Sequence, residues 1–219
     1  MIDVDSAGIE EQNDSFDKIL EGRRSIREFK PVLPPRELIE QIIRAGLLAP
    51  FAGEGGTVSL DRQFRVIPRD SHATVKLSGI MKRRAATASE RLRQQMEQTP
   101  SSQQHGQFLV NRLKMMGDRG VPGVGSDPYY IVVGERKGAA SDKSLSHCMQ
   151  NMWLKATALG LGFHLLTITG TMAEDEDFCD LLGIPYGQYT LDGCGVGYPN
   201  STPIPMERPQ VADVTRWID

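Results

Sequence analysis

Apolar residues recur every three to four positions in several parts of the chain, and this spacing predicts amphipathic helices. Residues 35–48 show a period close to 3.6, and Pro35 stands in the first turn, where no N–H donor is needed. Residues 143–159 show the same period and end before Gly160 and Gly162, which stop a helix. Further helices are expected at residues 15–21, 71–96, 105–116, 174–182 and 211–218.

Other segments have the character of strands. Residues 129–133 are five consecutive strand formers without polar alternation, which predicts a strand covered on both faces. Residues 63–67 alternate between apolar and polar, and strands are also expected at residues 163–169 and 188–198. Because strands and helices do not alternate regularly, we expect an α+β fold with helices around a small sheet.

Composition narrows the class of protein. A chain of 219 residues with 39% apolar residues suits one domain, which we expect over residues 15–219 behind a polar arm at residues 1–14. The net charge of −3 argues against a general nucleic-acid binder. The arm has no apolar core and is no signal peptide, and residues 156–173 hold too many threonines and glycines for a membrane span.

The cysteines and histidines give no sign of a metal site. Cys148, Cys179 and Cys194 are far apart and form no CxxC pair, so neither a disulfide framework nor structural zinc is expected, and a reducing cytoplasm is the natural compartment. The four histidines lack metal-ligand spacing. His147 and Cys148 are adjacent on a predicted helix and therefore point apart.

The densest group of chemically useful residues is Arg23, Arg24, Ser25 and Arg27. Guanidinium groups match the oxygens of phosphates and carboxylates, so this group is a candidate anion site. A solvated basic turn explains the same residues equally simply. The basic run at residues 82–93 also has two explanations. It is either a solvated helix face or a lid over an anionic cofactor or NADPH.

Glycines offer weaker signals. Gly193, Gly195 and Gly197 recur at every second position of a predicted strand, so something approaches one face of that strand closely, and helix packing is the favoured explanation. No GxGxxG or GxxxxGK[ST] motif is present, so the usual nucleotide-binding fingerprints are missing.

Three segments together resemble the FMN-dependent nitroreductase family. Residues 19–50 resemble its N-terminal signature, from ILEGRRSIREF to the Ala49-Pro50 pair. Residues 150–162 resemble its central helix and the end of that helix, and the stretches LGIP and GVGYP resemble its C-terminal strand region. Residues 70–125 match poorly, in a region that is variable in this family and shapes substrate access.

The resemblance implies a small, mostly antiparallel sheet surrounded by helices, in an intertwined homodimer with two FMN molecules at the subunit interface. Arg23, Arg24, Ser25 and Arg27 match positions that hold the FMN phosphate, the ribityl chain and the pyrimidine side of the ring. Arg208 falls where a C-terminal basic residue meets the phosphate, within an arm at about residues 199–219.

Two further segments are implicated by the same resemblance. Pro50, Phe51, Ala52 and Glu54 match a loop that the partner subunit lays against the flavin. Residues Leu166, Thr167 and Ile168 match a segment whose backbone passes the flavin N5. The chain departs from the family pattern at Glu54, where asparagine is usual, and at Met206, which is often lysine. A carboxylate near the flavin would oppose the negative charge gained on reduction.

The resemblance implies an oxidoreductase in which FMN takes hydride from NAD(P)H and passes it to nitroaromatic, quinone-like or other small acceptors. No catalytic side chain is expected, because the reaction takes place at the flavin N5. Two alternatives stay open: a non-catalytic flavin-binding sensor of the same fold, which Glu54 favours, and a specialised flavin reaction such as reductive dehalogenation.

Overall fold

A four-stranded sheet with the order β1-β2-β4-β3 lies at the centre of the molecule. The structure is a computed structural model that describes residues 6–51, 61–98, 103–138, 143–201 and 203–218. All three strand pairings are antiparallel. The strands are β1 (Arg62–Pro68), β2 (Tyr129–Arg136), β3 (Gly162–Leu165) and β4 (Tyr189–Gly197). The expected α+β class and small antiparallel sheet are therefore confirmed.

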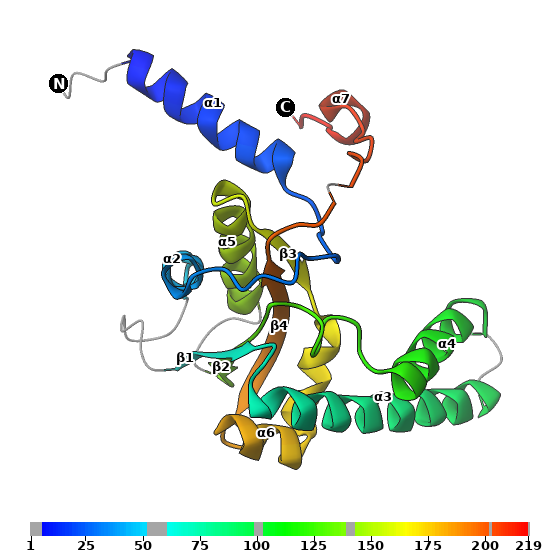
Figure 1. The fold of residues 1–219 in the computed structure, drawn as a ribbon. Coiled ribbons are helices and arrows are strands. Elements are labelled where there is room, and N and C mark those ends of the chain that lie inside the picture. The colour runs from blue at the N-terminus through cyan, green and yellow to red at the C-terminus, as the bar shows by residue number, and fades with distance from the viewer. Residues whose placement is uncertain (1–5, 52–60, 99–102, 139–142, 202, 219) are drawn as a thin grey trace.

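Helices α2 (Arg36–Leu47) and α5 (Ser144–Ala158) cover one face of the sheet (Figure 1). Their apolar sides meet side chains from β2, β3 and β4 in one core, which includes Ile42, Met149, Ile131 and Phe163. The two helices pack closely at Gly46, because a Cβ there would lie 2.8 Å from Met152 Cγ. The apolar residues that recur in residues 35–48 and 143–159 thus correspond to the buried sides of α2 and α5.

A second core lies on the other face of the sheet. It is formed by α3 (His72–Gln98), the 3₁₀ helix η2 (Thr167–Glu174) and α6 (Glu176–Leu182), packed on side chains of β1, β2 and β4. Since β2 contributes Tyr130 and Val132 to this core and Ile131 and Val133 to the other, it is covered on both faces as predicted.

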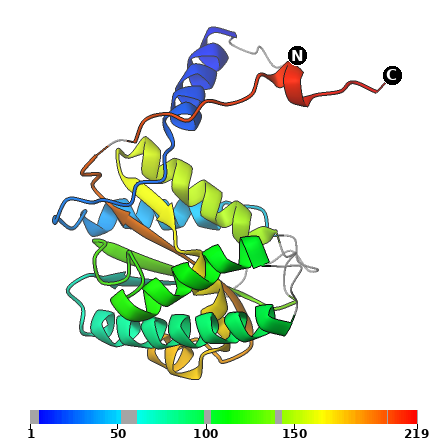
Figure 2. The same cartoon turned by 90° about the vertical axis from the view of Figure 1, so that its right-hand side faces the viewer.

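The long helix α3 continues beyond the sheet and pairs there with α4 (Gln103–Arg119) (Figure 2). The two helices approach closely where Gly117 lies against Ala86, and the Ser89 hydroxyl donates a hydrogen bond of 3.0 Å to the Val110 carbonyl. Helices α3 and α4 therefore form a helical hairpin, which we call the α3–α4 hairpin.

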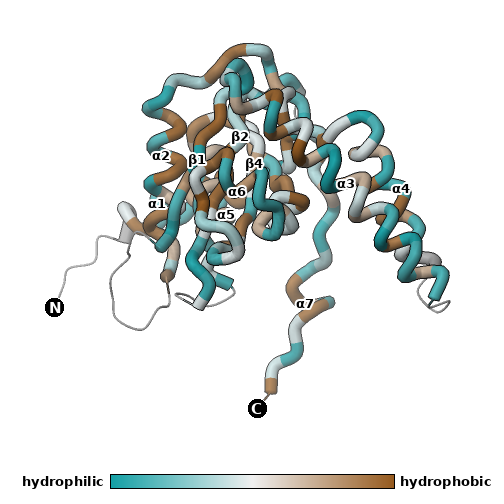
Figure 3. The backbone as a smooth tube through the Cα atoms, turned by 90° about the horizontal axis from the view of Figure 1, so that it is seen from below, coloured by the Kyte–Doolittle hydropathy of each residue, from teal (hydrophilic) through white to brown (hydrophobic). Residues whose placement is uncertain are grey.

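Both ends of the described chain extend from the body. Helix α1 (Ser6–Gly22) begins at Ser6, so the helix expected at residues 15–21 starts earlier than predicted. Residues 203–218, which include α7 (Val211–Val214), lie away from the body (Figure 3), and all are exposed. The helix expected at residues 211–218 is thus limited to its first four residues.

The strand expected at residues 163–169 also ends early. It stops at Leu165, and the chain turns into η2, where the Thr169 N–H donates to the Leu166 carbonyl at 2.9 Å. β-Branched threonine and isoleucine favour a strand locally, but tertiary contacts decide here. No helix in the described part of the chain is long and apolar enough to cross a membrane.

Candidate functional site

The segment after α1 runs along β3. Ser25 pairs in parallel with Phe163, and the Ile26 N–H donates a hydrogen bond of 3.1 Å to the Phe163 carbonyl. Ile26 is buried, whereas Arg27 is exposed. This pairing sets the position of Arg27 beside β3.

Arg23 and Arg24 lie at the start of this segment, against α5. The Arg23 guanidinium lies 4.3 Å from the centre of the Trp153 ring, and Trp153 Nε1 donates a hydrogen bond of 3.1 Å to the Arg24 carbonyl. Arg24 Nη1 donates to the carbonyls of Arg23 and Glu21. These contacts hold both arginines without using a carboxylate.

Arg208 of the C-terminal arm lies close enough to Arg23 for the two charges to interact. Burial, followed by the charges of Arg208 and Arg24, lowers the pKa of Arg23. Within the described ranges, none of these three arginines forms an ion pair with a carboxylate. We call Arg23, Arg24 and Arg208 the arginine cluster. Such uncompensated positive charge favours binding of an anion.

Arg27 and the segment Leu166–Ile168 line the same cavity, of about 470 Å³. The α3–α4 hairpin forms one wall of this cavity, and β3 and η2 form the other. We call it the Leu166 cavity. Its lining residues are Arg27, Arg84, Ala88, Leu109, Arg112, Leu113, Met115, Met116, Val121, Pro122, His164, Leu165, Leu166, Thr167, Ile168 and Thr171.

The position of the Leu166–Ile168 segment depends on Gly193. The Leu166 N–H donates to the Gly193 carbonyl at 2.7 Å, and a Cβ on Gly193 would overlap the Thr169 side chain. The Thr169 hydroxyl also bonds Tyr130 Oη at 2.8 Å. Gly193 therefore makes room for the helix η2, as the favoured explanation of helix packing predicts. Gly195 and Gly197 instead make room for neighbouring loop and strand side chains.

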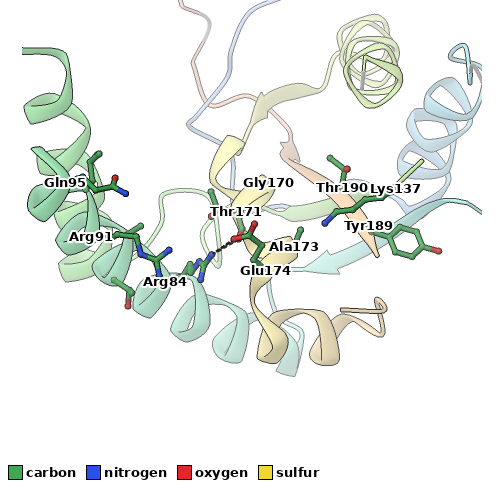
Figure 4. Close-up of a pocket in the computed structure, with 13 residues that line it drawn as sticks. Arg84, Arg91, Gln95, Lys137, Gly170, Thr171, Ala173, Glu174, Tyr189 and Thr190 are labelled. Atoms are coloured by element: carbon green, nitrogen blue, oxygen red, sulfur yellow. Dashed lines mark hydrogen bonds and ion pairs between the residues drawn. The ribbon is translucent and has the colours of Figure 1, made fainter. Parts of the chain in front are cut away.

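A second cavity, of about 480 Å³, lies between α3 and the ends of β2 and β4 (Figure 4). Arg84 lines both cavities and pairs with Glu174 at 3.3 Å, as the dashed line in Figure 4 marks. Arg91 and Lys137 also line this second cavity. The basic side chains Lys82, Arg83 and Arg93 are exposed, and Arg83 and Arg93 form surface ion pairs. The run thus serves partly as a solvated face and partly as a cavity wall.

Pro50 and Phe51 do not line the Leu166 cavity within one chain. Phe51 lies beside the guanidinium of Arg62, 5.1 Å from ring centre to Cζ, and the Pro50 carbonyl accepts from Arg62 Nη2 at 3.3 Å. Ala52 and Glu54 lie outside the described residues. Arg62 further binds the carbonyls of Gly46 and Ala49, the Ser144 hydroxyl and the Glu135 carboxylate.

Sequence reasoning missed a buried pair at the floor of the Leu166 cavity. His164 Nε2 and Asp127 Oδ2 lie 2.6 Å apart, although 37 residues separate them along the chain. No local motif connects the two residues. The only sequence signal near them is Gly195, whose Cβ would lie 2.6 Å from His164 Nε2.

A model of the nitroreductase family matches residues 20–198. The chain therefore belongs to the nitroreductase family. No curated protein matches it.

Solved structures share its fold at low sequence identity. An FMN-bound nitroreductase from Bacteroides fragilis is 18% identical, with a TM-score of 0.69 over 93% of this chain and 98% of that one. An FMN-bound nitroreductase from Desulfitobacterium hafniense is 23% identical, with a TM-score of 0.66 over 94% and 98%. The FMN-dependent nitroreductase NfnB from Mycobacterium smegmatis, in complex with NADPH, is 16% identical, with a TM-score of 0.63 over 95% and 100%.

Proposed function

We propose that the protein is an FMN-dependent oxidoreductase that takes hydride from NAD(P)H and reduces small acceptors such as quinones or nitroaromatics. The observation that carries this proposal is the arginine cluster, which is made of three cations that have no carboxylate partner among the described residues. Membership of the nitroreductase family and the FMN-bound relatives support it. FMN would supply the hydride chemistry.

The residues present fit such a cofactor. A phosphate is an anion with several acceptor oxygens, and arginine forks donate to it in pairs. The cluster offers Arg23 and Arg208, whose mutual repulsion an anion relieves. Ser25, at the turn towards β3, offers a hydroxyl for the ribityl chain.

The ring would lie towards Arg27 and the Leu166 cavity. A cation such as Arg27 stabilises negative charge that develops on a reduced ring. The backbone of Leu166, Thr167 and Ile168 would pass its reactive edge. The loop from Pro50 and Phe51 through Ala52 and Glu54 would reach the ring from a partner subunit.

We further propose that the working form is a homodimer. Within one chain, Ile204, Val211, Trp217 and Ile218 are each at least 75% exposed. Ile9, Phe16 and Leu20 form an apolar stripe on α1 that is also exposed. Apolar surface of this extent on two protruding elements favours burial against another subunit.

Titration of the FMN-free protein with FMN, followed by flavin fluorescence, tests the proposal. We expect binding by the wild type and an affinity about ten- to a hundredfold lower for Arg23→Ala, since one charged hydrogen-bonding partner is lost. Arg36→Ala removes an exposed arginine elsewhere and serves as the matched control. The bound flavin should bleach anaerobically with NADH or NADPH and recover with a quinone. A wild-type protein that binds no flavin would refute the proposal.

A further inference from the structure

His164 and Asp127 form a buried pair between two elements. His164 is on β3 and Asp127 lies just before β2, and they are 5% and 3% exposed. Their side chains are joined at 2.6 Å between Nε2 and Oδ2. Phe29 stacks on the imidazole, with ring centres 5.9 Å apart. Because a carboxylate only accepts, Nε2 carries a proton and donates it to Asp127.

The surrounding backbone makes room for this pair. Gly195 faces His164 across the β3–β4 pairing, and a Cβ on Gly195 would overlap Asp127 Oδ2. Gly123 has a φ of +97°, and a Cβ there would lie 2.8 Å from Asp127 Oδ2 and 3.2 Å from His164 Cε1. The pair is therefore fixed in one geometry by two positions that tolerate no side chain.

The second ring nitrogen of His164 takes no part in the pair with Asp127. Nδ1 has no hydrogen-bond partner among the described residues, and none of their buried side-chain nitrogens or oxygens is left without one. Nδ1 is therefore not completely buried. His164 is also one of the residues that line the Leu166 cavity.

Among the side chains that line the described cavity, His164 is the one suited to donate a proton. Arg27, Arg84 and Arg112 are the other ionisable lining residues, and no acidic residue is among those lining the described cavity. Arginines keep their protons at neutral pH. Imidazole is a common general acid, and a carboxylate bonded to the far nitrogen holds the ring in one orientation.

We propose that His164, held by Asp127, is the general acid that protonates an oxygen-bearing acceptor, of the quinone class, during its reduction in the Leu166 cavity. This inference rests on the proposed function, which supplies the hydride from reduced FMN. A quinone becomes a hydroquinone by gaining one hydride and one proton. The hydride brings both electrons. The Nδ1–H bond of the imidazolium breaks, its electron pair stays on nitrogen, and a new O–H bond forms on the acceptor. Water then returns the proton to Nδ1.

A comparison of two electron acceptors tests proton transfer separately from electron transfer. A quinone needs the proton, whereas ferricyanide takes single electrons and needs none. Pre-reduced, FMN-loaded wild type, His164→Gln, Asp127→Asn and the exposed-site control His147→Gln are mixed with each acceptor in a stopped-flow instrument. We expect His164→Gln to slow oxidation by the quinone about 10²- to 10⁴-fold. Oxidation by ferricyanide should change by less than about threefold, and His147→Gln should match the wild type with both acceptors.

A purely structural role for the pair would give a different pattern. The substitutions would then slow flavin oxidation by both acceptors equally, or by neither, and either result overturns the inference. In the wild type, the quinone rate should be slower in D₂O, because a proton moves to the acceptor in this step. His164→Gln should lose this effect. Asp127→Asn should show a smaller loss of quinone rate than His164→Gln, since Nδ1 remains.

A measurement on the wild type tests the inference even if the variants do not fold. Nitrogen-15 NMR resolves the imidazole nitrogens of the chain's four histidines. Addition of a quinone to the oxidised, FMN-loaded protein should shift the Nδ1 resonance of His164 and leave that of His147 unchanged. An unresponsive His164 overturns the inference. Failure of the proposed function is seen separately, as absence of FMN binding by the wild type, and it overturns both.

Discussion

Arg62 and Glu135 form an ion pair at 2.6 Å in which both side chains are almost completely buried. Arg62 lies at the start of β1 and Glu135 near the end of β2. The remaining guanidinium donors bind Ser144 and the backbone carbonyls between Gly46 and Pro50. One side chain thus ties the end of α2 and the first residue of the following loop to the sheet and to α5.

Arg62→Met should destabilise the protein strongly. The substitution leaves Glu135 buried without its partner, which costs about 3–5 kcal/mol of unfolding free energy. Urea denaturation of the flavin-free protein measures this change. Arg36→Ala breaks an exposed pair with Glu40 and should change stability by less than about 1 kcal/mol. The double variant Arg62→Met/Glu135→Leu should be more stable than Arg62→Met alone, and equal stabilities would contradict the argument.

Arg208→Ala should weaken FMN binding about ten- to a hundredfold and leave riboflavin binding unchanged. The two flavins differ in the phosphate, and the proposed role of Arg208 is to bind that group. A higher salt concentration should weaken FMN binding less in the variant than in the wild type. The variant lacks the attraction between Arg208 and the phosphate, which salt screens. Equal losses for both flavins, measured by fluorescence titration, would show that Arg208 acts on something other than the phosphate.

Removal of residues 203–219 should convert a dimer into a monomer. Sedimentation at micromolar concentration should give about twice 24.2 kDa for the full chain and the mass of one chain for the truncated form. Val75→Ala, which changes an exposed apolar residue on α3 away from the arm, should stay dimeric. A full chain that sediments as a monomer with FMN bound would rule out the shared-site proposal.

The three cysteines should resist modification in the folded protein. All are buried free thiols, and burial raises the pKa of Cys148 to about 12 from an ordinary value of 9.0. At a given pH below 9 this leaves about a thousandfold less thiolate. Ellman's reagent at pH 8 should therefore label no thiol quickly and all three after unfolding in guanidinium. Fast labelling of the native protein would be inconsistent with this packing.

Asp192→Asn should stabilise the protein at pH 7. Burial raises the pKa of Asp192, and the hydrogen bond from the Gly193 N–H at 2.7 Å opposes this only in part. A carboxyl group whose pKa is higher in the folded state binds its proton more tightly there, so its ionisation destabilises the fold as pH rises. The advantage of the variant should be larger at pH 7 than in acid and should disappear below pH 3.8, the ordinary pKa. Thermal denaturation at both pH values measures it, and a gain of equal size at both would contradict this cause.

Helices were predictable from the sequence because burial on one side leaves a period. Helices α2 and α5 pack on the sheet along one side, so their apolar residues recur as expected. Strand β2 was predictable from its unbroken apolar run, because it is covered on both faces. The FMN-dependent family was recognisable for a related reason. Arg23 to Arg27 lie in consecutive positions, and a short run of this kind is visible without knowledge of the fold.

Features that depend on tertiary contacts were not predictable. Residues 6–14 were expected to belong to a polar arm, because the first part of α1 has few apolar residues and Ile9 is exposed. The turn at Leu166 follows from the contact of Thr169 with Gly193. The pairing of His164 with Asp127 joins residues that only the sheet brings together.

The two walls of the Leu166 cavity come from different parts of the chain, because the α3–α4 hairpin forms only one of them. One wall comes from a single uninterrupted stretch, residues 72–119, and contributes Arg84, Leu109 and Arg112. The opposite wall comes from the strand and turn that carry His164 and Leu166. Insertions or exchanges within the hairpin can therefore alter which molecules enter the cavity without replacing any residue of the opposite wall.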